Sequence, residues 1–89
     1  MIHDYSTLKE GDVVAFMITG MVPHYRGVIL TTNGYQNRPE IKVTHLRRHI
    51  NDPWEPDTSW DKFPPLKGDD YILQEVLDSS GASQTTATT

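Results

Sequence analysis

Short apolar runs separated by turn-forming residues dominate the first half of the chain. Residues 13–18, reading VVAFMI, form a β-branched and aromatic run that follows Gly11-Asp12 and stops at Thr19-Gly20. Runs of this length and composition between glycine-containing turns are typical of strands. The sequence therefore predicts a first strand over residues 13–18.

Two further strands are predicted from the residues that follow. Residues 25–32, reading YRGVILTT, are β-rich and stop at Asn33-Gly34, a pair that adopts positive φ at low cost and favours a turn. Residues 40–44 alternate polar and apolar side chains, as a half-buried strand does.

The spacing of apolar residues changes after the third predicted strand. Leu46 and Ile50 are four residues apart, which is the spacing of one helical turn. We therefore expect a short helical turn over residues 44–50, with Leu46 inward and Arg47 and Arg48 outward.

Residues 51–65, here called the strap, are rich in proline and aromatic side chains. Proline fixes φ and removes a hydrogen-bond donor, so we expect an ordered loop or a polyproline-like segment without regular structure. The aromatic side chains would pin this segment to the body. The prolines are Pro53, Pro56, Pro64 and Pro65, and the aromatic residues are Trp54, Trp60 and Phe63.

The C-terminal part divides into an apolar run and a polar tail. Residues 71–77, reading YILQEVL, suit a closing strand, which we favour, or a short helix capped by one of the preceding aspartates. Residues 78–89 have almost no apolar content and are expected to be disordered, so the folded domain is assigned to residues 1–77. LKEGD at residues 8–12 and LKGDD at residues 66–70 are similar, but too weakly to indicate a repeat.

Length and charge limit what this fold can be. A chain of 89 residues without cysteine has room for one domain with a thin core and no disulfide framework. The formal net charge of −4 is unevenly distributed: residues 24–49 carry a net +4 and residues 52–78 a net −6. These two segments either neutralise each other or present two different surfaces.

Several short strands without a long helix favour a small mainly β barrel. The segment LKEGDVVAFMITGMVPHYRGVIL, residues 8–30, resembles the opening of SH3-like barrels, including KOW-type modules, and the resemblance as a whole covers residues 8–50. In those domains a Gly-Asp pair, here Gly11-Asp12, introduces the first strand, and a glycine followed by aliphatic residues, here Gly27, lies in the second. The resemblance implies about five strands and a close backbone approach at that glycine.

Two groups of residues are candidate binding sites. Exposed tryptophans beside prolines favour protein binding, and this set comprises Pro53, Trp54, Pro56, Trp60 and Phe63. The alternative role for the same aromatic residues is to cover an open barrel edge and complete the core, and the two roles are compatible. Basic and aromatic residues favour nucleotide or RNA binding, and this set comprises Tyr25, Arg26, Tyr35, Arg47 and Arg48.

No motif in the sequence indicates an enzyme, a cofactor or a metal centre. His45 and His49 have the spacing of two ligands on one helical face, with His24 or Asp52 as possible further ligands, but the pattern places no third ligand with them. Ser, His and Asp occur without a nucleophile elbow, a phosphate loop or a zinc signature.

The sequence favours a non-catalytic interaction module, such as an adaptor, an assembly subunit or a small inhibitor of bacterial or phage origin, with a protein partner or larger assembly. A nucleotide- or RNA-binding SH3-like domain is the alternative. No apolar run approaches the ~20 residues that cross a bilayer, and the N-terminus lacks signal-peptide features. We therefore expect a cytoplasmic protein without a membrane partner.

Overall fold

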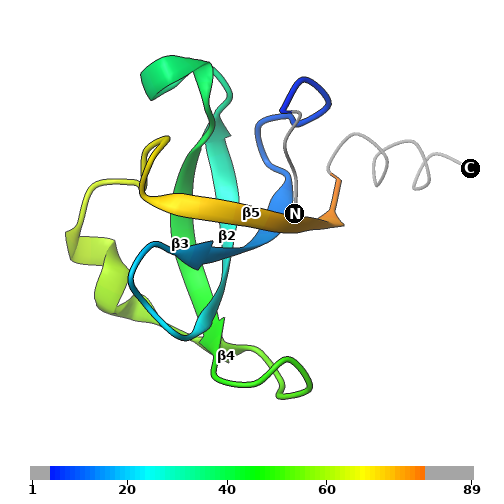
Figure 1. Ribbon diagram of the computed structural model, residues 1–89, viewed down its shortest axis with the longest axis vertical. Coiled ribbons are helices and arrows are strands. Elements are labelled where there is room, and N and C mark those ends of the chain that lie inside the picture. Colours follow the sequence, from blue (N-terminus) through cyan, green and yellow to red (C-terminus); the bar gives the residue numbers. More distant parts are fainter. Residues whose placement is uncertain (1–4, 80–89) are drawn as a thin grey trace, which may run out of the picture.

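The protein is built around one antiparallel sheet of five strands in the order β4-β3-β2-β1-β5 (Figure 1). The computed structural model describes residues 5–79. Two short 3-10 segments, η1 and η2, interrupt the connections between strands. The elements are β1 (Val13–Ile18), β2 (His24–Thr31), η1 (Tyr35–Asn37), β3 (Glu40–Arg47), β4 (Glu55–Pro56), η2 (Thr58–Lys62) and β5 (Tyr71–Asp78).

Three of the predicted strands form where the apolar pattern placed them. β1 has the predicted limits, and β2 starts and ends one residue earlier than expected. The favoured assignment of residues 71–77 is confirmed, because β5 pairs along β1 as a strand and is not a helix. Every second side chain of β2 is buried over most of its length, as the alternation requires.

The helical turn predicted for residues 44–50 is wrong, because β3 continues through Arg47. Val43 pairs with Gly27 and His45 pairs with Arg26, so Thr44 is an extra residue in the ladder. One extra residue in a strand shifts the alternation by one position, which is a β-bulge. The change of spacing before Leu46 reflects this bulge, and the short helical turns lie instead in η1 and η2.

The connection between β2 and β3 is a turn, as expected, but its positive φ angles are elsewhere. Gln36 and Asn37 have φ values of 57° and 58°, whereas Gly34 has φ −78°. Gly34 is needed for space, because a Cβ there would lie 2.7 Å from the Arg38 carbonyl oxygen.

The strap contains more regular structure than predicted. Glu55 and Pro56 form β4 on the outer edge of β3, and residues 58–62 form η2. Proline is tolerated at such an edge because a two-residue edge strand does not need its missing donor.

One apolar cluster lies between the strands. Phe16 of β1 is stacked on Tyr25 of β2 at 6.1 Å between ring centroids, and its ring also meets the edge of Tyr71 of β5. In Figure 1, β5 crosses β2 and β3 steeply, so the sheet is strongly curved around this cluster. The sheet is not shown to be closed as a barrel, because β4 and β5 are not paired with each other.

The two similar sequence segments form the same local turn. Lys9 N–H donates to the Asp12 carboxylate at 2.9 Å, and Lys67 N–H donates to the Asp70 carboxylate at the same distance. In both turns the aspartate N–H donates back to the lysine carbonyl. Each turn lies directly before a strand, β1 in one case and β5 in the other.

The predicted polar tail falls almost wholly on residues 80–89, which lie outside the described residues. Its first residue, Asp78, is the last residue of β5. Between residues 5 and 79, no helix is long and apolar enough to cross a membrane.

Candidate functional site

The strap is attached along the outer edge of β3 at two points, and a third attachment follows directly after it at Leu66. Glu55 and Pro56 pair with Leu46 and His45 in β4. Asp57 N–H donates to the Thr44 carbonyl at 3.0 Å. At the other end of β3, Leu66 and Ile41 exchange two backbone hydrogen bonds of 2.9 and 3.1 Å. The strap is therefore packed against the sheet.

Trp60 is the strap residue that joins the core. Its ring lies edge-on to Tyr25 with 5.9 Å between centroids, and it also contacts the Phe63 ring at 5.8 Å. Trp60 is partly buried against the apolar cluster. Of the two roles predicted for the strap aromatics, Trp60 has the covering role.

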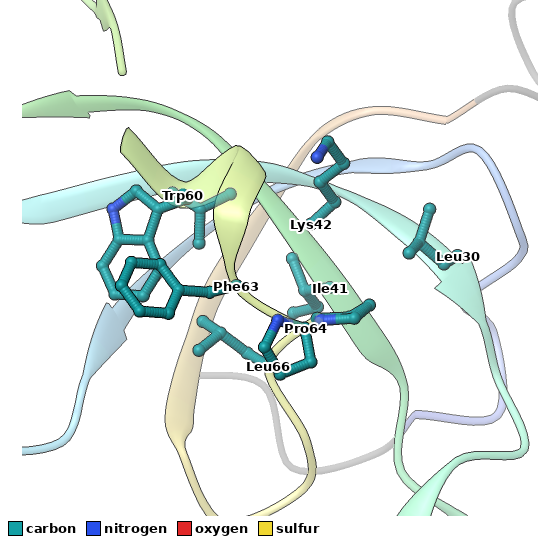
Figure 2. A pocket seen from close by; sticks show the side chains of 9 residues that line it. Leu30, Ile41, Lys42, Trp60, Phe63, Pro64 and Leu66 are labelled. Carbon is teal, nitrogen blue, oxygen red and sulfur yellow. The ribbon is translucent and has the colours of Figure 1, made fainter. Parts of the chain in front are cut away.

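Beside Trp60 the strap and β3 enclose a small apolar groove, shown in Figure 2. Its volume is about 120 Å³, below the ~300 Å³ at which small-molecule sites begin, so it suits one side chain of a partner better than a cofactor. The groove is lined by Leu30, Ile41, Lys42, Val43, Trp60, Phe63, Pro64, Pro65 and Leu66.

Two large apolar side chains at this groove remain open to solvent. Phe63 is 61% exposed and Leu30 is 43% exposed. At the rim, the Lys42 ammonium lies 3.1 Å from the Asp61 carboxylate. This ion pair is solvent-exposed on both sides and contributes little stability, so its effect is to give the apolar groove a polar border.

The other predicted protein-binding residues lie at the opposite end of β3. The Arg47 guanidinium is stacked on the Trp54 ring at 4.1 Å from its centroid. Pro53 is exposed and lines a hollow together with Arg47 and Arg48. Pro56 is exposed in β4. The predicted set is therefore divided, with only Trp60 and Phe63 at the groove.

The structure does not bring together most of the residues predicted to bind nucleotide or RNA. Tyr25 is only 2% exposed and its ring is packed in the core, so it cannot stack on a base. Burial is the main reason why the pKa of Tyr25 is raised, with a smaller contribution from Asp57. Tyr35 lies in η1, at the end of the β2–β3 hairpin opposite to Arg47. Arg26, on β2, is paired with His45 in the ladder.

The two spaced histidines do not share a helical face. His45 is in β3 with Nδ1 2.8 Å from the Thr44 hydroxyl, and His49 is exposed in the loop after β3. Within residues 5–79, no group of three or more His, Asp or Glu side chains is placed to hold a metal ion.

A polar cluster around Arg38, which the sequence did not reveal, fixes the far end of the sheet. The Arg38 guanidinium donates to the Tyr5 hydroxyl, lies 3.4 Å from the Asp69 carboxylate and covers the rings of Tyr5 and Tyr71. The Tyr71 hydroxyl donates to the Pro39 carbonyl. Burial raises the pKa of Tyr71 to about 12, with a further contribution from Tyr5.

Sequence reasoning also missed Leu30 and Pro64 as groove residues. Leu30 follows Val28 and Ile29, so three successive apolar residues break the alternation of β2. Because Ile29 is buried, alternation turns its apolar neighbours Val28 and Leu30 away from the core, and this was the available signal.

Comparisons with protein-family models, with curated proteins and with solved structures found no match for this chain.

Proposed function

We propose that this protein is a non-catalytic protein-interaction module that holds an apolar side chain of its partner in the groove beside Trp60. The observation that carries the proposal is the exposure of Phe63 and Leu30 on either side of that groove. Aromatic anchors next to a preformed pocket with a polar border are typical of the centre of a protein interface. An adaptor, an assembly subunit or a small cytoplasmic inhibitor would each use such a surface.

An SH3-like barrel is the architecture we propose for this module. β1 to β4 form a meander, and β5 returns to lie beside β1. The chain segment that leads into β5 leaves the outer edge of β3 at Leu66, only five residues before β5 begins on the edge of β1. One short chain segment thus links the two edges of a strongly curved sheet, which supports a barrel arrangement.

The proposal includes no catalytic step. The groups whose pKa values are clearly shifted within residues 5–79 are Tyr25, Arg38 and Tyr71. These groups pack the core or join the N-terminal segment to the sheet. Groups with shifted pKa values in an active site would instead converge on a cleft.

Nucleotide or RNA binding is the second candidate function. It is favoured by Arg47 and Arg48, neither of which forms an ion pair with another described residue. It is weakened by the burial of Tyr25 and by the net charge of −4, which opposes attraction of a polyanion.

The experiment that separates these functions is affinity capture from the native lysate with the full chain as bait, with and without nuclease. Retention of a defined protein after nuclease treatment, by the wild type but not by Phe63→Ser, is expected. The control Ile72→Ser alters a side chain that is 39% exposed on β5 and does not line the groove. Loss of all retained material on nuclease treatment would support the second candidate instead.

A further inference from the structure

A second surface lies at the end of the sheet where two loops meet. The pairing of His24 with Arg47 brings the β1–β2 loop (residues 19–23) next to the β3–β4 loop (residues 48–54). Val22 and Pro23 from the first loop and Arg48 and His49 from the second line one hollow of about 230 Å³. We call this end of the molecule the loop tip.

The loop tip carries unusually exposed apolar side chains. Val22 is 83% exposed, Ile50 is 63% exposed and Met21 is 42% exposed. These side chains come from both loops, and Val22 lines the hollow between them. Several exposed apolar side chains on two adjoining loops, with Val22 at the hollow between the loops, favour an interaction site.

The same end holds two arginines without ionic partners among residues 5–79. Arg38 and Lys42, at the other end of β3, pair with Asp69 and Asp61. Arg48 forms no ion pair in the described part of the chain, although the protein has 12 acidic residues. Arg48 also lines a second hollow, of about 210 Å³, together with Arg47.

Arg47 is held in place by its contact with Trp54. The guanidinium lies 4.1 Å from the ring centroid, and its buried Nε has no hydrogen-bond acceptor in the described structure. A guanidinium stacked on an aromatic face keeps its in-plane N–H groups directed sideways, which suits a carboxylate. The stacking therefore prepares an anion-binding group before any ligand arrives.

We propose that the loop tip binds an extended acidic peptide segment of a protein partner, with one apolar side chain in the hollow beside Val22 and adjacent carboxylates on Arg47 and Arg48. This surface is separate from the Trp60 groove, so it goes beyond the proposed function and does not depend on it. The two hollows share Arg48, which places an apolar residue and its acidic neighbour on one continuous path.

The charge around the arginines favours a peptide over a polyanion. Asp52 and Glu55 line the same hollow as the two arginines. These carboxylates repel a phosphate backbone or an anionic lipid surface, which presents many charges at once. Isolated carboxylates on an extended peptide can approach the guanidinium groups singly, and the apolar hollow selects their neighbour.

The test titrates the ¹⁵N-labelled full chain with three short peptides followed by NMR. The first has a leucine flanked by aspartate and glutamate, the second has serine in place of leucine, and the third has lysine in place of the acidic residues. We expect the first peptide to shift the amide signals of the non-proline residues in the ranges 21–24 and 47–55, with the second and third at least about tenfold weaker.

Variants make the result specific. Arg48→Glu is expected to weaken binding of the first peptide about tenfold or more, whereas Lys62→Glu makes the same change in net charge on η2 and should leave it unchanged. Val22→Ser should weaken binding of the first peptide and not of the second. The proposal is overturned if the first peptide causes no localised shifts at millimolar concentration, if Lys62→Glu weakens it as much as Arg48→Glu, or if only an oligonucleotide or anionic vesicles shift the loop-tip signals.

Discussion

At the residue scale, Gly27 shows how one missing side chain permits the close approach of β2 and β3. A Cβ at this position would lie 2.4 Å from the Lys42 carbonyl oxygen and 2.7 Å from an Ile41 methyl group. The first of these neighbours is backbone in the adjoining strand and cannot move aside independently. The close approach expected for this glycine from its resemblance to SH3-like barrels is therefore present.

Gly27→Ala is expected to lower the free energy of unfolding by about 2 kcal/mol, because the added methyl group overpacks the β2–β3 contact. Gly20→Ala is the control, since nothing lies within 4 Å of its added Cβ and only its φ of +84° opposes the change. The control should cost about 1 kcal/mol. Urea unfolding measures both, and a smaller loss for Gly27→Ala than for Gly20→Ala would contradict this explanation.

A second residue, Tyr71, makes the free energy of unfolding depend on pH. Its pKa is raised from 10.0 to about 12 in the folded state, so the unfolded chain loses this proton first as the pH rises. Stability from this group is complete below pH 10 and is lost as the pH rises to about 12, by up to roughly 3 kcal/mol.

Tyr71→Phe is therefore expected to cross the wild type in stability. Below pH 10 the variant should be about 1 kcal/mol less stable, because it lacks the hydrogen bond to the Pro39 carbonyl. Near pH 12 the order should reverse, since phenylalanine does not titrate. Parallel unfolding curves at both pH values would show that the Tyr71 phenol is not protected from ionisation by the fold.

At the element scale, the two turns that introduce β1 and β5 provide a matched pair. Both aspartate carboxylates accept a hydrogen bond of 2.9 Å from the lysine N–H three residues earlier. Asp12 is 1% exposed, whereas Asp70 is exposed. The same hydrogen bond is thus shielded from water in one turn and open to water in the other.

Asp12→Ala is expected to cost about 2 kcal/mol, because it leaves polar backbone without a partner at a buried site. Asp70→Ala should cost less than about 1 kcal/mol, since water can replace the carboxylate. Thermal and chemical unfolding of the two variants tests this difference. Equal losses would mean that burial does not decide the strength of these turns.

The strap also divides at this scale, since its two tryptophans have different surroundings. Trp60→Ala is expected to cost about 2 kcal/mol, because the ring is partly buried against Tyr25 and the core. Trp54→Ala should cost about 0.5–1 kcal/mol, the size of one exposed cation–π contact with Arg47. Denaturant midpoints of the two variants measure this order, and the reverse order would assign the core role to Trp54.

For the whole molecule, the sequence predicted the strands well because period-two alternation is a local signal. The helical turn was predicted from the four-residue spacing of Leu46 and Ile50, but Ile50 lies beyond β3 and the alternation before Leu46 is interrupted by the bulge at Thr44. The division of the strap depended on which end of β3 each aromatic residue lies against, and the burial of Tyr25 depended on packing with Phe16. Neither relation can be predicted from the local sequence pattern, because both depend on tertiary packing.

The charge distribution of the whole molecule shows both alternatives predicted from the sequence, which were neutralisation between the two segments and separate surfaces. Arg38 and Lys42 of the basic segment pair with Asp69 and Asp61 of the acidic segment. Arg47 and Arg48 remain without ionic partners in the described residues, at the loop tip. Neutralisation therefore occurs at one end of β3, and a distinct surface is presented at the other.

The most direct test of the proposed module substitutes one exposed side chain and measures the effect on both partner affinity and stability. Once a partner has been captured, its affinity for the wild type and for Phe63→Ser is measured by calorimetry, beside the unfolding free energy of each. Because Phe63 is 61% exposed, we predict about tenfold or greater loss of affinity with less than about 1 kcal/mol loss of stability. Unchanged affinity would contradict the assignment of the Trp60 groove as the protein-binding site.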